Sequence, residues 1–292
     1  EILLAIRLAQ LTQYRPFAEQ LLRDKQADVR RYAYETVFAL DRDAYTTLLP
    51  TMLDREASSL VLNVLRAGGR QGRTLETTAL EQLGTRLGSH GPMAAELEAV
   101  LDSLNMASAR ELLRTVYSRD LPEDHVQTLL SLCDTHSAAI SAALSSPTLQ
   151  QRPPLKYVYL YCVFSDEAFK KTPANQKLAN RILLKQVIES SAYSDPEKHR
   201  LIIRASADDR VTAETFLLEA VQGFTGDALL QALEVLSRQQ LSGQLSPFLW
   251  GLLQDDDTPL AIRFEAATLL LQIERKAVSD YVNSEILTHA TN

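Results

Sequence analysis

Apolar residues recur at helical spacing along nearly the whole chain, in segments of about 9 to 18 residues separated by short polar joints. A helix of that length is marginal in water on its own and needs a packed apolar face. Many short helices with short loops favour antiparallel neighbours, and therefore helical hairpins stacked in series. We predict helices at residues 2–12, 16–24, 27–40, 43–53, 55–67, 74–87, 93–104, 107–118, 122–133, 136–144, 155–165, 174–191, 195–204, 210–223, 226–238, 244–254, 259–274 and 277–288.

The composition agrees with an all-helical chain. Glycine (10 residues) and proline (11 residues) are scarce among the 292 residues. Strand-rich and nucleotide-binding folds need many glycines for turns and close backbone approach, whereas stacked helices need few. The sequence therefore predicts the all-α class.

One segment has the composition of a strand. Residues 157–164 are β-branched and aromatic, apart from one leucine and one cysteine. A lone strand would leave its backbone N–H and C=O groups unpaired, and the sequence offers no second strand to join it. We predict a buried helix here.

Two segments far apart in the sequence share one pattern. Both carry a proline and a phenylalanine, a leucine pair, an aspartate, a β-branched residue followed by arginine, and a small residue one turn later. The first is Pro16-Phe17, Leu21-Leu22, Asp24, Val29-Arg30, Ala33, Val37 and Leu40, and the second is Pro247-Phe248, Leu252-Leu253, Asp255, Ile262-Arg263, Ala266, Leu270 and Ile273. Proline is tolerated in the first turn of a helix, and aspartate is favourable ahead of the next helix. The pattern predicts a helical hairpin, in which Ala33 or Ala266 lets a neighbouring helix approach closely.

At these residues the chain resembles the HEAT-repeat family of armadillo-like α-solenoids, most clearly at residues 16–40 and 247–273. The resemblance implies a right-handed α-α superhelix of stacked hairpins. It also implies a ladder of aspartate and arginine between adjacent repeats, formed by Asp24 with Arg30, and by Asp255 or Asp257 with Arg263. A third copy at residues 49–54 is weaker, because no Val-Arg pair follows it, and residues 70–240 match by helix rhythm only.

A proline-rich break interrupts the helical pattern at Ser146–Pro154. We therefore expect two halves, residues 1–145 and 155–292. The helical rhythm resumes after the break, so the two halves are expected to form one continuous solenoid.

The charge distribution reverses locally. The net charge is −7, which argues against a nucleic-acid binder, because such proteins draw affinity from phosphate neutralisation. Between residues 152 and 185, however, only Asp166 and Glu167 oppose seven cations: Arg152, Lys156, Lys170, Lys171, Lys177, Arg181 and Lys185. With the tyrosines at 157, 159 and 161 nearby, the cations after Arg152 form a candidate site for an acidic partner. The alternative is solvated charge beside core aromatic residues.

The remaining candidates for chemistry favour structural roles. His125, Cys133 and His136, with two acidic residues nearby, lack the short paired spacing of zinc ligands. The glycine-rich loop at 68–73 lacks the phosphate-loop lysine, and the Ser89-His90 pair does not fit a nucleophile elbow. Residues 255–257, all aspartate, form a capping turn in the repeat pattern. We expect no catalytic residue, metal or cofactor.

The two cysteines, Cys133 and Cys162, lie in apolar surroundings. Two cysteines are too few for a disulfide scaffold, and free cysteine is often buried. We therefore expect two small buried hydrophobic residues.

These observations favour a non-enzymatic scaffold that binds another protein along a curved helical surface. The alternatives are a nucleic-acid-binding HEAT-like protein and a HEAT-like lyase or glycosylase, which needs a cleft of converging titratable groups. No stretch approaches the ~18 apolar residues of a membrane span. The chain opens on Glu1-Ile2-Leu3-Leu4 in what looks like mid-helix, so we expect a fragment or processed product, with room upstream for an anchor or signal. The compartment stays open, with the cytoplasm slightly favoured.

Overall fold

The computed structural model describes residues 1–68, 72–90, 94–118, 123–164, 172–208, 213–239, 241 and 243–290. The regular elements among them are α-helices and short 3-10 helices, and these residues form no strand. One isolated parallel bridge joins Arg73 and Leu104. The all-α class predicted from the periodicity and composition is therefore confirmed.

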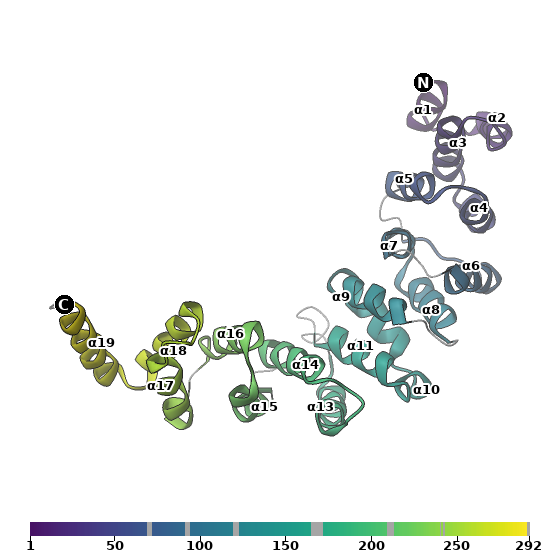
Figure 1. Cartoon of the computed structure of the whole chain (residues 1–292). Coiled ribbons are helices and arrows are strands. Elements are labelled where there is room, and N and C mark those ends of the chain that lie inside the picture. Colours follow the sequence, from purple (N-terminus) through teal and green to yellow (C-terminus); the bar gives the residue numbers. More distant parts are fainter. Residues whose placement is uncertain are drawn as a thin grey trace. The chain divides into compact units, whose positions relative to one another are not determined.

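The chain divides into two compact units, residues 1–163 and residues 164–292. The helices of unit 1 are α1 (Ile2–Leu8), α2 (Arg15–Leu21), α3 (Ala27–Leu40), α4 (Arg42–Arg55), α5 (Ser58–Gly68), α6 (Thr77–His90), α7 (Ala94–Ser103), α8 (Met106–Tyr117), α9 (Glu123–Leu144), α10 (Pro147–Gln150) and α11 (Pro153–Val163). Within this unit α1, α3, α5, α7 and α9 each pack on the next, and α4, α6 and α8 do the same in a second layer (Figure 1). Each helix thus buries its apolar residues against several neighbours.

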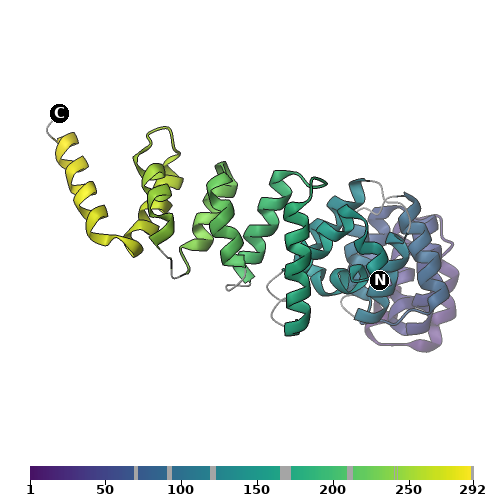
Figure 2. The ribbon, with the colours of Figure 1, turned by 90° about the horizontal axis from the view of Figure 1, so that it is seen from below.

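Unit 2 repeats this two-layer arrangement. Its helices are α13 (Ala174–Glu189), α14 (Asp195–Asp208), α15 (Ala213–Ala220), α16 (Gly226–Leu236), α17 (Ser246–Gln254), α18 (Leu260–Ile273) and α19 (Arg275–Ala290). Helices α14, α16 and α18 pack in sequence, while α15 and α17 pack on α14 and α18 (Figures 1 and 2). The core between the layers includes Leu217, Leu233, Leu249 and Leu269, each with no exposed surface.

The helices begin and end near the residues that the sequence predicts. In both copies of the hairpin pattern the proline lies at the start of a helix: Pro16 is in the first turn of α2 and Pro247 is in the first turn of α17. The predicted break between residues 133 and 136 is also present, since His136 has non-helical dihedral angles (φ −126°, ψ 24°) inside α9. Pro50, in the weaker third copy, lies inside α4 and opens no helix.

The strand-like segment is helical over residues 157–163. These residues belong to α11, which packs against α9 and α10. Tyr157, Val158 and Leu160 are at most 2% exposed. The prediction of a buried helix is confirmed, because packing against helical neighbours outweighs the β-propensity of these residues.

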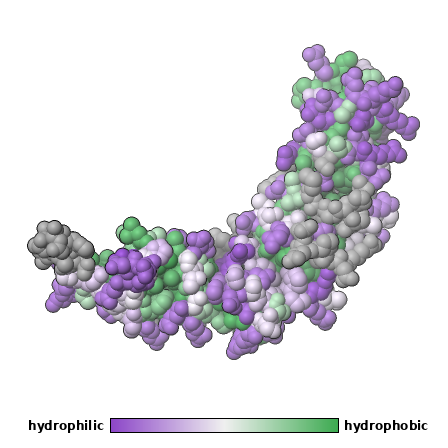
Figure 3. All heavy atoms as spheres, in the orientation of Figure 1, coloured by the Kyte–Doolittle hydropathy of each residue, from purple (hydrophilic) through white to green (hydrophobic). Residues whose placement is uncertain are grey.

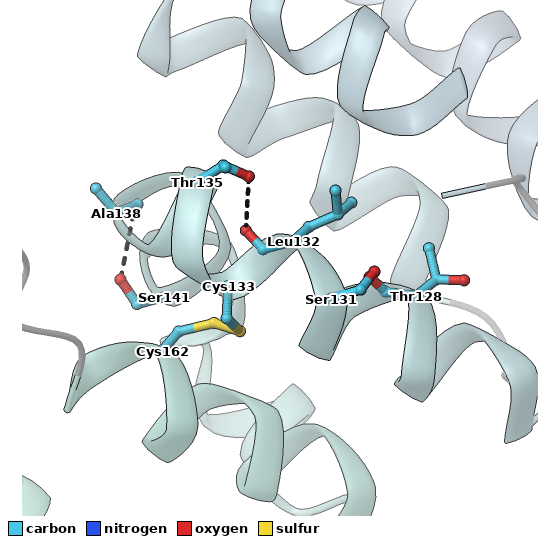
Figure 4. Close-up of a disulfide and its surroundings, with 8 residues drawn as sticks. All are labelled: Thr128, Ser131, Leu132, Cys133, Thr135, Ala138, Ser141 and Cys162. Carbon is cyan, nitrogen blue, oxygen red and sulfur yellow. Dashed lines mark hydrogen bonds between the residues drawn. A yellow bond between two sulfur atoms is a disulfide. The ribbon is translucent and has the colours of Figure 1, made fainter. Parts of the chain in front are cut away.

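The two cysteines form a disulfide, which corrects the prediction of two free buried residues. Cys133 on α9 and Cys162 on α11 have Cα atoms 5.2 Å apart, and their sulfur atoms are bonded (Figure 4). The bond exists because α9 and α11 pack face to face, which brings together residues 29 positions apart. Disulfides persist in oxidising compartments and are rare in the cytoplasm, so the bond weighs against the cytoplasmic location that the sequence slightly favours.

The division into units differs from the predicted halves. The proline-rich stretch at 146–154 contains the short helix α10 and the start of α11, and both belong to unit 1. Helix α11 is held there by its contact with α9 and by the disulfide. The boundary therefore falls after Val163, about one helix later than the break in the sequence pattern.

Across the described residues, no helix is long and apolar enough to cross a bilayer.

Because the disulfide links α9 to α11, we expect unit 1 to be less stable when the bond is absent. Replacing both cysteines by serine (Cys133→Ser with Cys162→Ser) should lower the free energy of unfolding of this unit by about 3 to 4 kcal/mol, because the open loop gains chain entropy when unfolded. Chemical denaturation followed by circular dichroism measures this change. Titration of the denatured, unreduced protein should find no free thiol, and two free thiols per chain would contradict the bond.

Gly84 lies where α6 and α8, two helices of the second layer of unit 1, approach each other closely. A Cβ atom at this position of α6 would lie 2.6 Å from Cγ2 and 2.8 Å from Cβ of Thr115 on α8. Gly251 on α17 is also helical, but a Cβ atom there meets nothing within 4 Å. Alanine substitutions at these two glycines therefore distinguish the effect of a close helix contact from the effect of helix propensity.

We predict opposite effects for alanine at these two positions. Gly84→Ala should destabilise unit 1 by about 1 to 3 kcal/mol, because α6 and α8 must move apart. Gly251→Ala should stabilise unit 2 by about 0.5 to 1 kcal/mol, because alanine has the higher helix propensity. Thermal unfolding of both variants beside the wild type measures the difference, and equal stabilisation by both would refute the close contact.

Candidate interaction surfaces

The predicted basic residues do not all fall on described positions. Lys170 and Lys171, with the opposing Asp166 and Glu167, lie outside the described residues. Lys156 is half-buried on α11 in unit 1. Lys177, Arg181 and Lys185 all lie on α13 in unit 2, so this helix carries the part of the candidate site that the structure describes.

Helix α13 places its three cations beside exposed apolar residues. Leu178 is 56% exposed and Ile182 is 54% exposed, and both lie one residue after a cation. The opposite side of the helix faces the interior of the unit, where Leu184 and Val187 are buried. Leu178 and Ile182 are therefore surface residues beside the cations.

One ion pair on this helix involves Lys185. Lys185 lies 3.8 Å from Glu189, the single carboxylate of α13, and both side chains are 64% exposed. An exposed pair of this kind is worth little in water and dissociates easily. The face formed by Lys177, Leu178, Arg181, Ile182 and Lys185, hereafter the α13 face, combines positive charge with apolar area.

The aromatic residues near the basic segment belong to the core. Tyr157 and Tyr159 are 2% and 3% exposed, and the ring of Tyr157 stacks on that of Tyr161 at 6.2 Å between centroids. Arg152 donates to the backbone carbonyl of Tyr117 at 3.1 Å, within unit 1. Tyr157 and Tyr159 are therefore core residues, as the alternative interpretation of this segment expected.

In the first predicted ladder, Arg30 pairs with Glu56 and not with the side chain of Asp24. The guanidinium of Arg30 makes a two-pronged contact with Glu56, with Nε to Oε1 and Nη2 to Oε2 both at 2.8 Å. Arg30 also donates to the backbone carbonyl of Asp24, while the Asp24 carboxylate accepts from the backbone N–H of Gln26. Glu56 lies at the end of α4, so Arg30 joins the α2–α3 hairpin to the next helix pair.

The second copy differs in the same way. Arg263 pairs with Asp256 at 3.1 Å and donates to the backbone carbonyl of Leu253, whereas the sequence suggested Asp255 or Asp257 as its partner. Asp255 instead closes the turn, accepting from the Thr258 hydroxyl and from the backbone N–H of Asp257. The Thr258 hydrogen bond lowers the pKa of Asp255.

The small residues of the repeat lie where the pattern places them. Ala33 on α3 and Ala266 on α18 are both fully buried. Ala33 belongs to a cluster with Leu3, Ala18 and Val37, which comes from α1, α2 and α3. A larger side chain at either alanine would push the neighbouring helices apart.

The candidate metal ligands do not converge. Cys133 is bonded to Cys162, and His125 on the same helix is buried with its ring edge against Tyr117, at 6.1 Å between centroids. His136 approaches Asp102 at 3.8 Å. No group of three or more histidine, cysteine or acidic residues suited to a metal occurs among the described residues.

The glycine-rich loop falls largely on residues 69–71, which are not described, and Ser89 and His90 close the end of α6 next to undescribed residues. The described end of the loop has a structural role. Arg73 is 9% exposed, lies 4.1 Å over the ring of Tyr45, and donates to the Phe38 carbonyl at 3.0 Å. This arginine is used inside unit 1 and does not cradle a phosphate.

Burial accounts for the largest pKa shifts. It raises the pKa of Tyr45 to about 12 and also raises the pKa of Tyr117. Burial lowers the pKa of His199, whose ring lies 4.0 Å from that of Phe224. Each shift favours the neutral form of a packed side chain.

Sequence reasoning missed a second surface on unit 2. Leu260, Phe264 and Leu271 on α18 are 80%, 67% and 43% exposed. The helical periodicity gave no sign of this, because α18 carries apolar residues on two sides and such a helix is predicted to be buried. The spacing of these residues by four and seven positions was nevertheless visible in the sequence.

Comparisons with protein-family models, with curated proteins and with solved structures found no match for this chain. Function is therefore inferred from the chain's own residues.

The Arg30–Glu56 contact generates a stability prediction. Arg30→Ala should lower the free energy of unfolding of unit 1 by about 2 to 4 kcal/mol, because the Glu56 carboxylate, 5% exposed, loses its charged partner. Arg263→Ala should cost at most about 1 kcal/mol, because its partner Asp256 is 93% exposed. Urea denaturation measures both. A double-mutant cycle with Glu56→Gln should give a large coupling energy, and additive effects would argue against the pair.

Proposed function

We propose that this chain is a non-enzymatic scaffold for binding another protein, built as a right-handed superhelix of HEAT-type hairpins. Three observations support the architecture. Hairpins such as α2–α3 and α17–α18 pack tightly, successive helices form two layers in each unit, and Arg30 ties one hairpin to the next through Glu56. Stacked hairpins of this kind present long surfaces that suit protein partners.

The observation that carries the proposal is the α13 face. Leu178 and Ile182 offer apolar area that is already outside the core, and the cations beside them offer charge that attracts an opposite partner. Apolar contact supplies affinity, while complementary charge sets the rate of association and the choice of partner. The partner we propose is an acidic protein segment that also carries exposed apolar side chains.

A charge-reversal experiment tests this proposal. The variant Lys177→Glu, Arg181→Glu, Lys185→Glu should lose the proteins that the wild type retains in pulldowns from extracts of the source organism. The expected loss is at least tenfold, because attraction becomes repulsion while the apolar pair is unchanged. Retained proteins are identified and quantified by mass spectrometry.

The matched control reverses three exposed arginines elsewhere, Arg66→Glu, Arg200→Glu and Arg238→Glu, which change the net charge equally. The control should retain the same proteins as the wild type. Leu178→Ala with Ile182→Ala should weaken retention as well, since the apolar area is lost. Undiminished retention by the charge-reversed variant would end the assignment to α13. Binding of single- or double-stranded oligonucleotides that the reversal abolishes would favour a nucleic-acid partner instead.

A further inference from the structure

Helix α18 has two apolar sides, and only one of them is covered. Ile262, Ala266, Leu269 and Leu270 are at most 4% exposed and face the core of unit 2. On the other side Leu260, Phe264, Ala267 and Leu271 follow one another at spacings of four, three and four residues, and this row is the α18 stripe. Figure 3 shows hydrophobic surface on this part of unit 2.

The α18 stripe differs from ordinary surface leucines. Isolated exposed apolar residues are common, but a row of them along one helix is typical of a surface that packs against another helix. Phe264 is 67% exposed although it is one of the largest apolar side chains in the unit. Apolar rows on two sides of a helix are typical of a helix that packs on both, so the α18 stripe indicates a covering partner.

The two ends of the α18 stripe carry opposite charge. Asp255, Asp256 and Asp257 precede the helix, and all three are exposed. Arg275 and Lys276 follow it and are exposed as well. A helix that covers the α18 stripe therefore meets negative charge at one end and positive charge at the other.

We infer that the α18 stripe packs against the same stripe of a second copy of this chain, with the two α18 helices antiparallel. A twofold axis through the midpoint between residues 265 and 266 sets Leu260 opposite Leu271 of the second copy, and Phe264 opposite Ala267. The same antiparallel arrangement brings the acidic turn before α18 towards Arg275 and Lys276, which follow α18 in the second copy. Glu274, which lies at that end as well, is engaged within its own chain by Ser246 and Trp250. Leucine thus faces leucine and phenylalanine faces alanine across the axis.

Charge complementarity selects a second copy over an unrelated helix. Any other occupant must supply a basic group and an acidic group at opposite ends, whereas this chain already carries an acidic turn before its apolar row and two basic residues after it. Antiparallel alignment also places the opposite ends of the two helix dipoles together. One helix face is small beside the ~800 Å² per partner of a standard interface, so the dimer should dissociate in the micromolar range.

The inference is independent of the proposed function, because the α13 face contributes nothing to the α18 contact. The first test is sedimentation velocity of the full chain over a concentration series. The wild type should shift from monomer to dimer, while Phe264→Glu and Leu271→Glu should each raise the dissociation constant at least tenfold. A wild type that stays monomeric at the highest concentration would overturn the inference, as would undiminished dimerisation by both variants.

The second test uses two variants that cannot pair with themselves. Arg275→Glu with Lys276→Glu makes both ends of the α18 stripe acidic, and Asp256→Lys with Asp257→Lys makes both ends basic. Asp255 is left unchanged because it caps the turn through Thr258. Each variant alone should be monomeric at concentrations where the wild type is dimeric, and their equimolar mixture should dimerise.

The control Arg200→Glu with Arg238→Glu lies on the same unit and changes the net charge as much as the acidic variant. It should dimerise as the wild type does. Circular dichroism melting curves establish that all variants are folded. Failure of the mixture to dimerise, with folded variants and a dimeric wild type, would contradict the antiparallel pairing.

Discussion

The structure depends on one constraint, which is that most helices in the described part of the chain are too short to be stable in water alone. Helices such as α2, with 7 residues, and α17, with 9, gain stability only when their apolar residues are buried against neighbours. Helices α3 and α5, for example, touch the helices before and after them in their own layer and at least one helix of the other layer. The fold is therefore a consequence of many shared interfaces between neighbouring helices.

The same constraint explains which helices look amphipathic. Helix α8 buries Leu112, Leu113 and Val116 on one side while Arg110 on the other side is exposed. Helix α11 is surrounded by α9 and α10 and is apolar almost throughout. Helix α18 has the composition of a surrounded helix, yet part of its circumference is exposed. That mismatch between composition and surroundings is what sets α18 apart.

Helix positions were predictable from the sequence because apolar spacing and helix-terminal residues are local signals. Pro16 and Pro247 lie at the starts of their helices, and the kink at His136 lies where the predicted helices were separated. Three of the hydroxyls of α9, on Ser131, Thr135 and Ser141, donate to carbonyls three residues earlier (Figure 4). Pairings between distant residues were not predictable in this way. The bond from Cys133 to Cys162 and the contact from Arg30 to Glu56 depend on how helices meet, which spacing along the chain does not encode.

The two candidate surfaces of unit 2 differ in where their complementary groups come from. On α13 three cations lie beside exposed apolar residues, so the surface suits a different molecule that brings acidic and apolar groups. On α18 the acidic and basic ends flank a single apolar row, so the missing half is another copy of the same surface. A surface whose charges balance under a twofold rotation favours its own copy, whereas one with uncompensated charge repels its own copy. Self-association through α18 and capture of an acidic partner through α13 are therefore compatible on one chain, because neither surface competes for what the other binds.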